Sequence, residues 1–219
     1  MPKMKTKNNC ILYNENNVKI DNKKVERVQQ CFCEKYIDPN DSVLELGARY
    51  GSVSCAINLI LNNKKNQVSV EPDDRVWDVL TKNRDNNNCE FNIVYGLISK
   101  EKFSLNKNYD EGYFTHTVKD ENSKINNYTL NEVKTKYNIK KFNVLVADCE
   151  GFLEQFFDDN PELYDELELL IYERDNDNNE GGSRRNCNYN KIEKTLINKG
   201  FKKIAFRGYG TQDLVWSKR

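Results

Sequence analysis

The sequence predicts an α/β protein with a mostly parallel sheet that carries helices on both faces. Short apolar runs typical of buried strands alternate along the chain with segments whose apolar residues recur at helical spacing. The first run, residues 43–46, stops at Gly47 and passes through Gly51 into a helix that starts at Ser52. The last two runs flank a turn with two glycines, which predicts an antiparallel hairpin at the C-terminal end.

The chain before the first strand divides into two parts. Residues 1–22 are polar and predict a loosely held segment, with residues 11–13 as a candidate docking strand. Residues 23–37 place apolar side chains on one face of a helix, which the sequence DPND at residues 38–41 ends. Because no later break in composition appears, residues 23–219 predict a single domain.

The middle of the chain continues the alternation of strands and helices. The expected strands cover residues 67–70, 91–95, 142–147 and 167–172, and the expected helices begin at Asp73 and cover residues 129–137 and 151–158. The run 142–147 is almost continuously apolar, as in a strand that is buried on both faces. Residues 100–127 are less regular and indicate short edge strands or a flap on the substrate side.

The last part of the chain begins with a polar segment. Residues 174–188 are too polar to pack and contain a Gly-Gly hinge, so we expect them to form a mobile lid. Residues 189–199 predict a helix that ends at Gly200. Residues 201–206 and 212–216 form the two strands of the expected hairpin.

The overall composition excludes some classes of protein. Lysine and arginine number 34 and aspartate and glutamate 34, so no global field draws the chain to nucleic acid or to an anionic membrane. No apolar run has the length of a membrane span, and the N-terminus lacks an apolar signal core, so we expect a soluble, cytoplasmic protein. Runs of asparagine and lysine are typical of an AT-rich genome and suggest a viral or protist source.

The seven cysteines show no metal-binding pattern in the sequence. Cys31 and Cys33 are too close together for a CxxC site, and no second pair accompanies them. We therefore expect reduced cysteines that act as small apolar side chains.

Two features predict a nucleotide site at the carboxyl ends of the first two strands. Gly47 and Gly51 suit a turn in which the backbone bends sharply and lies against a ligand, because they lack a Cβ. Glu71, followed by Pro72, ends the second strand, at the distance from Glu45 where a βαβ unit carries the carboxylate that accepts hydrogen bonds from ribose hydroxyls.

These segments resemble the FkbM-type methyltransferases, a family of class I S-adenosylmethionine (SAM)-dependent enzymes. The matching segments are ELGARYG at residues 45–51, VEPDD at 70–74, YTLNEV at 128–133 and FNVLVADCEGFLEQFF at 142–157. The resemblance implies a Rossmann-like, seven-stranded sheet and SAM as cofactor, with the Gly96-Leu97 segment flanking the adenine. Arg49, Tyr50 and Cys149 depart from the family's usual residues and leave the acceptor open.

In open α/β sheets, ligands bind beyond the carboxyl ends of the strands, and this rule gathers the candidate residues around one cleft. The predicted cofactor site consists of Glu45, Gly47, Ala48, Gly51, Glu71, Pro72, Gly96, Leu97 and Asp148. The predicted catalytic residues are Asp148, Glu150 and Glu173. Asp148 is the first candidate for the base that removes the acceptor's hydroxyl proton, and Glu150 is the second.

Other roles for these side chains remain open at this point. Asp148 and Glu150 also suit an acidic pair that the dipole of the next helix stabilises. Together with Glu173 they offer oxygen ligands for a divalent cation, although no ligand spacing demands one. His116 is a further candidate base, and Arg184 and Arg185 of the lid are candidate contacts for a phosphate on the acceptor.

The sequence thus predicts a SAM-dependent O-methyltransferase that acts on a hydroxyl. The family resemblance implies that this hydroxyl belongs to a sugar or glycoconjugate. The first rival is a degenerate domain that keeps the fold and binds a partner without chemistry. The second is a nucleic-acid methyltransferase, for which a basic surface and stacking aromatic residues would be expected.

Overall fold

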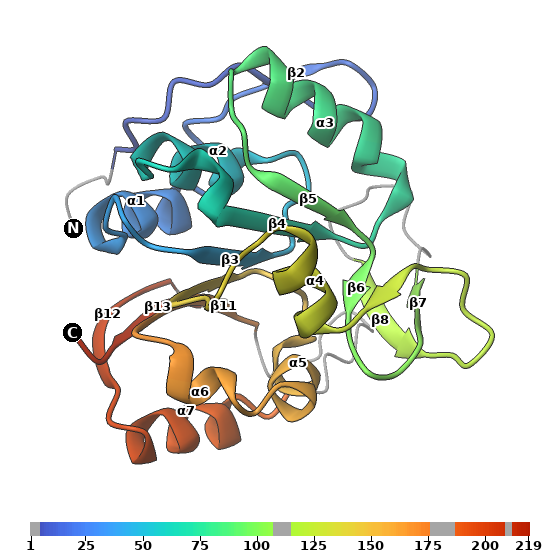
Figure 1. Ribbon diagram of the computed structural model, residues 1–219. Helices are drawn as coiled ribbons and strands as arrows, with labels where there is room; N and C mark the ends of the chain where they lie inside the picture. The colour runs from blue at the N-terminus through green and yellow to red at the C-terminus, as the bar shows by residue number, and fades with distance from the viewer. Residues whose placement is uncertain (1–4, 107–114, 176–186, 209–211) are drawn as a thin grey trace.

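A seven-stranded sheet forms the centre of the computed structural model, which describes residues 5–106, 115–175, 187–208 and 212–219 (Figure 1). The order of its strands is β12-β13-β11-β10-β3-β4-β5. The strands are β3 (Val43–Leu46), β4 (Gln67–Glu71), β5 (Asn92–Tyr95), β10 (Val144–Ala147), β11 (Leu169–Arg174), β12 (Lys202–Arg207) and β13 (Gln212–Ser217).

The strand directions confirm the predicted sheet. The strands from β11 across to β5 are parallel, whereas β13 is antiparallel to β11 and forms an antiparallel hairpin with β12. The strand order reverses between β3 and β10, which are neighbours. The register pairs Leu46 of β3 with Val70 of β4 and with Ala147 of β10, so the carboxyl ends of these three strands lie level with one another.

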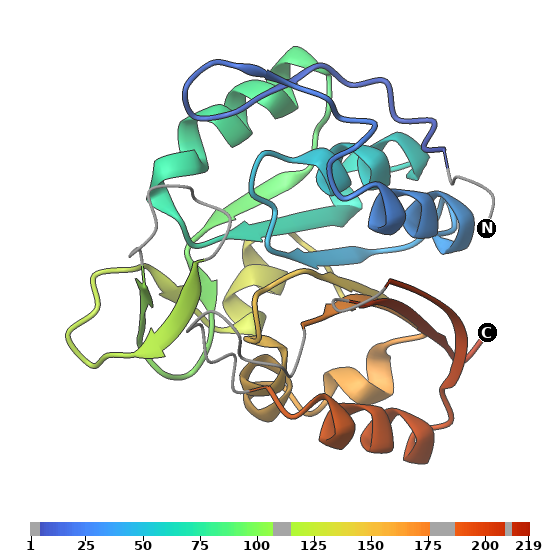
Figure 2. The ribbon, with the colours of Figure 1, turned by 180° about the vertical axis from the view of Figure 1, so that it is seen from behind.

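Helices cover both faces of the sheet (Figures 1 and 2). One face carries α1 (Arg27–Tyr36), α2 (Ser52–Ile60) and α3 (Trp77–Asn86), and the other carries α4 (Leu130–Lys136), α5 (Leu153–Asp159), α6 (Leu163–Glu166) and α7 (Tyr189–Asn198). Alternation along β3 sends Val43 into the core beneath α1 and α2 and Leu44 into the core beneath α4 to α7. None of the described helices is long and apolar enough to cross a membrane.

Two helix starts follow from residues that the sequence singles out. Asp73 accepts a hydrogen bond from the Arg75 N–H at 3.1 Å and caps the short 3-10 turn Asp74–Val76 that leads into α3. At α4, the Thr129 hydroxyl accepts from the Glu132 N–H, and the Glu132 carboxylate accepts from the Thr129 N–H. This reciprocal capping box fixes the helix expected over residues 129–137.

The N-terminal segment packs more closely than we expected. Residues 12–13 form the predicted strand, β1 (Leu12–Tyr13), which pairs with β2 (Lys19–Ile20), and Leu12 is fully buried. Asn83 on α3 and Asn87, which follows the last residue of α3, hydrogen bond with the backbone of Tyr13 and Ile11. These asparagine side chains thus replace the backbone partners that a longer strand would supply. Figure 2 shows the N-terminal segment running beside α3.

The less regular stretch after β5 forms two small sheets beyond the end of that strand (Figure 1). β6 (Leu97–Ile98) pairs with β9 (Asn127–Tyr128), and β7 (Phe103–Asn106) pairs with β8 (His116–Lys119) in an antiparallel hairpin. These strands agree with the expected edge strands.

Candidate functional site

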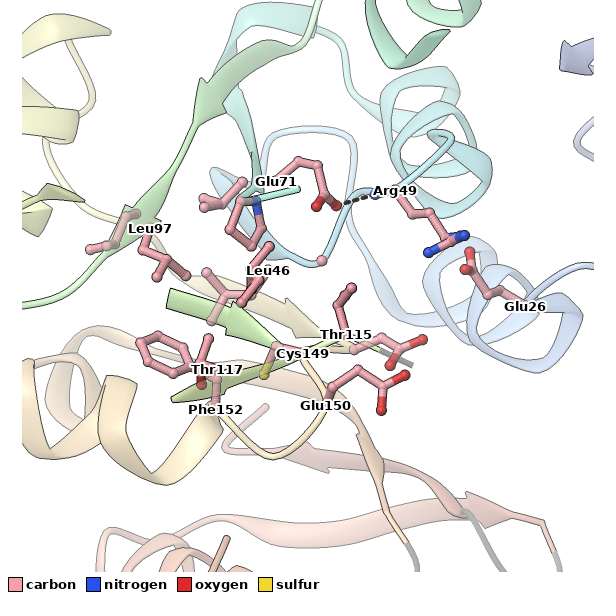
Figure 3. A pocket seen from close by; sticks show the side chains of 16 residues that line it. Glu26, Leu46, Arg49, Glu71, Leu97, Thr115, Thr117, Cys149, Glu150 and Phe152 are labelled. Atoms are coloured by element: carbon pink, nitrogen blue, oxygen red, sulfur yellow. Dashed lines mark hydrogen bonds between the residues drawn. The ribbon is translucent and has the colours of Figure 1, made fainter. Parts of the chain in front are cut away.

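A cavity opens at the carboxyl ends of β3, β4 and β10, where the strand order reverses (Figure 3). The space between its walls, together with the open solvent at its mouth, amounts to about 770 Å³. Its walls are Glu26, Leu46, Gly47, Arg49, Val70, Glu71, Pro72, Leu97, Ile98, Leu105, Thr115, Thr117, Asp148, Cys149, Glu150 and Phe152.

The turn after β3 is held against both neighbouring strands. The N–H groups of Gly47 and Ala48 donate to the Val70 carbonyl oxygen at 3.0 and 3.1 Å. Gly47 has φ +89°, and a Cβ on it would lie 1.8 Å from the carbonyl oxygen of Asp148. This position therefore requires glycine both for its backbone conformation and for the close approach of the β10 loop.

Glu71 presents a fixed carboxylate at the end of β4. Its Oε2 accepts from the Arg49 N–H at 2.6 Å and its Oε1 from the Asp73 N–H at 2.8 Å. Burial raises the pKa of Glu71 to about 7, although the two N–H groups favour its charged form. Because a carboxylate oxygen has two lone pairs, both oxygens keep the capacity to accept from a ligand.

The structure brings together some of the predicted cofactor residues and leaves others outside the cavity. Gly47, Glu71, Pro72, Leu97 and Asp148 line it, whereas Glu45, Ala48, Gly51 and Gly96 do not. Ala48 packs in the core beneath α3, Gly51 begins α2 in a left-handed conformation, and Gly96 donates its N–H to the Glu71 carbonyl oxygen. These three support the turn and the strand end from behind.

Glu45 lies on the opposite face of β3 from the one we expected. Strand alternation directs Leu46 to the cavity and Glu45 under α2, where it is 2% exposed. Its Oε2 accepts from the Ser69 hydroxyl at 2.5 Å and from the Gln67 side-chain amide at 3.4 Å. Burial raises the pKa of Glu45 to about 7.

Asp148 is the centre of an acidic region. Burial, and after it the charge of Asp148, raise the pKa of Glu26 to about 8, of Glu173 to about 9 and of Asp213 to about 7. Asp148 and Glu150 line the cavity, but Glu173 lies behind it, paired across the sheet with Asp213. The raised pKa favours the protonated form of Glu173. Its expected catalytic role stays a prediction.

Glu26 was not predicted as part of the cavity wall. Glu26, just before α1, has φ +46° and accepts a hydrogen bond from the Ser52 hydroxyl. The Arg49 guanidinium extends toward Glu26 (Figure 3) and lies 4.5 Å from the centre of the Tyr50 ring. Glu26 falls inside an ordinary helical pattern, so the sequence contains no signal for its position.

Another part of the wall comes from the β7–β8 hairpin, which belongs to the stretch expected to form edge strands or a flap on the substrate side. Thr115 and Thr117 line the cavity, whereas His116, which alternates with them, does not. A polar contact of 3.3 Å joins His116 Nε2 and the Asn106 side-chain amide nitrogen. The lid expected over residues 174–188 falls mostly on residues 176–186, so Arg184 and Arg185 lie outside the described residues.

Asp148, Glu150 and Glu173 do not converge on a common point. Within the described parts of the chain, the only group of three or more His, Cys, Asp or Glu ligand atoms that lie within 4.8 Å of one another comes from Cys10, Cys55 and Cys89. The sequence did not predict this grouping, because these cysteines are spread along the chain.

Comparison by sequence finds no matching family model and no matching curated protein. Several solved structures are similar in fold. An O-methyltransferase from Bacillus cereus in complex with SAH superposes with a TM-score of 0.54 at 14% identity, over 88% of this chain and 80% of that chain. A ribosomal protein L11 methylase from Lactobacillus delbrueckii subsp. bulgaricus superposes with a TM-score of 0.52 at 13% identity, over 91% of this chain and 81% of that chain.

A precorrin-6y C5,15-methyltransferase from Geobacter metallireducens gives a TM-score of 0.52 at 11% identity, over 89% of this chain and 87% of that chain. The chain has a Rossmann-like methyltransferase fold. At these identities the similarity concerns the fold, so the reaction has to be argued from the site.

Proposed function

We propose that this protein is a SAM-dependent methyltransferase that transfers a methyl group to a hydroxyl, as the resemblance to FkbM-type enzymes implies, and that the acceptor is a sugar or glycoconjugate. The observation that carries the proposal is the fixed carboxylate of Glu71, which faces a cavity beside the Gly47 turn at the reversal of strand order.

The cavity wall fits the parts of SAM. Glu71 would accept hydrogen bonds from the ribose hydroxyls, and the apolar side chains of Leu97 and Ile98, with Pro72, would cover the adenine. The absence of a side chain on Gly47 leaves the turn open to close approach by the ligand. SAM carries its reactive methyl group on a positively charged sulfonium, which transfers it to a nucleophile.

The charge of the cavity favours a cationic ligand. The described wall residues include four with carboxyl groups and one with a guanidinium group, Arg49. The carboxyl groups are those of Glu26, Glu71, Asp148 and Glu150. The pKa values of Glu26 and Glu71 are raised, which means that their charged forms cost free energy at these buried positions. A nearby cation offsets that cost, so the sulfonium and the ammonium group of SAM suit this region.

Asp148 is the residue to which we assign the acceptor's proton. It directly follows β10 and lines the cavity, and its backbone N–H donates to the Leu46 carbonyl oxygen at 3.0 Å, which holds its backbone beside the turn. Glu150 also lines the cavity and is the alternative base. Either carboxylate would take the hydroxyl proton as the oxygen attacks the methyl group.

The same acidic region disfavours a phosphate-bearing acceptor next to the reacting atoms, because like charges repel. The chain also has no net charge with which to attract nucleic acid. A neutral hydroxyl compound therefore fits better, and Thr115 and Thr117 offer hydroxyl groups to hydrogen bond with it.

Titration calorimetry with SAM tests the proposal directly. We expect micromolar binding to the wild type and a clear loss of affinity in Glu71→Ala, with wild-type binding in Glu90→Ala, which removes an exposed carboxylate away from the cavity. Sugar acceptors are then screened for SAH formation with and without Mg²⁺. Wild-type protein that binds no SAM would contradict the proposal and favour a degenerate domain.

A further inference from the structure

Three cysteines from distant parts of the sequence meet beside the N-terminal segment. Cys10 belongs to that segment, Cys55 lies in α2, and Cys89 lies in the connection from α3 to β5. Their sulfur atoms all lie within 4.8 Å of one another. Cys55 and Cys89 are buried and Cys10 is partly exposed, so the group has an inner side and a side open to solvent.

The backbone of Cys10 is fixed on both sides by groups other than the sulfur atoms. The Asn8 side chain accepts from the Cys10 N–H and donates to the Ser52 carbonyl oxygen of α2, both at 3.0 Å. The Asn87 side chain accepts from the Ile11 N–H and donates to the Ile11 carbonyl oxygen, both at 2.9 Å. The protein therefore holds the three sulfurs together in advance of any ligand.

The surroundings of the sulfurs select the type of ion. Leu12, Leu80 and Phe91 pack around them, and no His, Asp or Glu of the described residues joins the group. Hard cations such as Ca²⁺ and Mg²⁺ need oxygen ligands, whereas thiolates bind soft or borderline ions such as Zn²⁺ and Cu⁺. With three thiolates, a divalent ion leaves one negative charge to bury and a monovalent ion leaves two, so the divalent ion costs less.

We propose that Cys10, Cys55 and Cys89 bind a thiophilic divalent cation of the Zn²⁺ type. Zn–S bonds of about 2.3 Å place tetrahedral ligands about 3.8 Å apart, which lies within the observed separation. Binding replaces the thiol protons, which leave to solvent. The exposed side of Cys10 gives the ion a route of entry and leaves room for a fourth, solvent ligand.

An ion at this place would tie the N-terminal segment to α2 and to the start of β5. The same segment reaches the turn of the candidate active site, because the Tyr50 hydroxyl donates to Glu15 and accepts from Arg49 Nη2. We therefore expect the ion to stabilise the N-terminal segment. Metal binding can be measured without SAM, so its test does not depend on the proposed function.

The test uses the whole chain, reduced and freed of metal with a chelator, and titrated with Zn²⁺ against a chromophoric competitor. We expect one Zn²⁺ per chain, an increase in melting temperature, and ultraviolet thiolate-to-metal absorption when Cd²⁺ replaces Zn²⁺. Cys10→Ser removes a ligand and should weaken binding by at least about a hundredfold, because the loss of even an outer-shell partner costs about 10–100-fold. Cys31→Ser, a buried cysteine on α1 outside the group, should bind as the wild type does.

Circular dichroism of metal-free Cys10→Ser shows whether the variant folds. We expect it to fold, because Cys10 is partly exposed. Equal Zn²⁺ affinity in Cys10→Ser and the wild type would overturn the proposal. So would one-to-one binding of Cu⁺ without binding of Zn²⁺, or a protein isolated without reductant that holds a disulfide within the group and, once reduced, binds no ion.

Discussion

The carbonyl oxygen of Asp148 lies 1.8 Å from the point that a Cβ on Gly47 would occupy. This contact joins the turn after β3 to the candidate base after β10, so neither loop can move away from the other without changing the cavity. The atom that a Cβ would meet is a backbone oxygen, which cannot move aside by a change of side-chain rotamer.

Gly47→Ala should therefore destabilise the protein and impair SAM binding. Gly200→Ala is the matched control, because Gly200 has nearly the same φ, +86°, but no atom within 4 Å of its added Cβ. The control should lose about 1 kcal/mol in urea unfolding, the penalty of the left-handed conformation alone. Gly47→Ala should lose at least about 2 kcal/mol more. Equal losses would show that the two loops do not restrain each other.

The sequence predicted the sheet well because its strands are short apolar runs with clear ends. The approach of Asp148 to Gly47 follows from the sheet order, since β3 and β10 are neighbours. The position of Glu71 could also be predicted, because it follows the last residue of an apolar run and thus comes to the carboxyl end of a strand.

Other features were not predicted: the position of Glu45 follows from strand alternation, and the others depend on three-dimensional packing. Glu45 precedes the turn and looked like a ligand residue, but strand alternation directs it beneath α2. The polar N-terminal segment looked solvated, but Asn83 and Asn87 supply partners for its backbone. Cys10 joins Cys55 and Cys89 only because of that docking.

Glu45→Gln should stabilise the protein at high pH. The folded-state pKa of Glu45 is raised from 4.5 to about 7 by burial, so the folded state holds a proton that the unfolded chain has lost between these values. Stability is then lost as the pH rises from about 4.5 to about 7. The shift corresponds to about 3 kcal/mol as an upper bound.

Urea unfolding of Glu45→Gln and the wild type at pH 5 and pH 8 measures this effect. The glutamine can still accept from the Ser69 hydroxyl, so we expect similar stability at pH 5 and a more stable variant at pH 8. A variant that is less stable at pH 8 would indicate that the buried carboxylate is stabilising as an anion.

Asp148→Asn should separate catalysis from binding. The change keeps the size of the side chain but removes its basicity, so we expect methyl transfer to slow by roughly 10²–10⁴-fold. The change also removes one negative charge from the acidic region, so SAM affinity, followed by calorimetry, should fall as well, but by much less than the rate. Glu150→Gln is the comparison, and a greater loss of rate there would move the role of base to Glu150.

The affinity for SAM relative to SAH should rise with pH. SAM and SAH differ in the sulfonium charge, and both carry the amino group, so the ratio of their dissociation constants isolates the effect of that charge. Glu71 and Glu26 of the cavity wall have pKa values of about 7 and about 8, and the pKa of Glu173 behind the wall is about 9, so the region becomes more anionic as the pH rises. We expect the preference for SAM to increase roughly tenfold from pH 6 to pH 9.

Because a bound cation lowers these pKa values, SAM should also release more protons than SAH at pH 7.5. Calorimetry in two buffers of different ionisation enthalpy measures this difference. A ratio that does not change with pH would place the sulfonium away from the acidic region around Asp148.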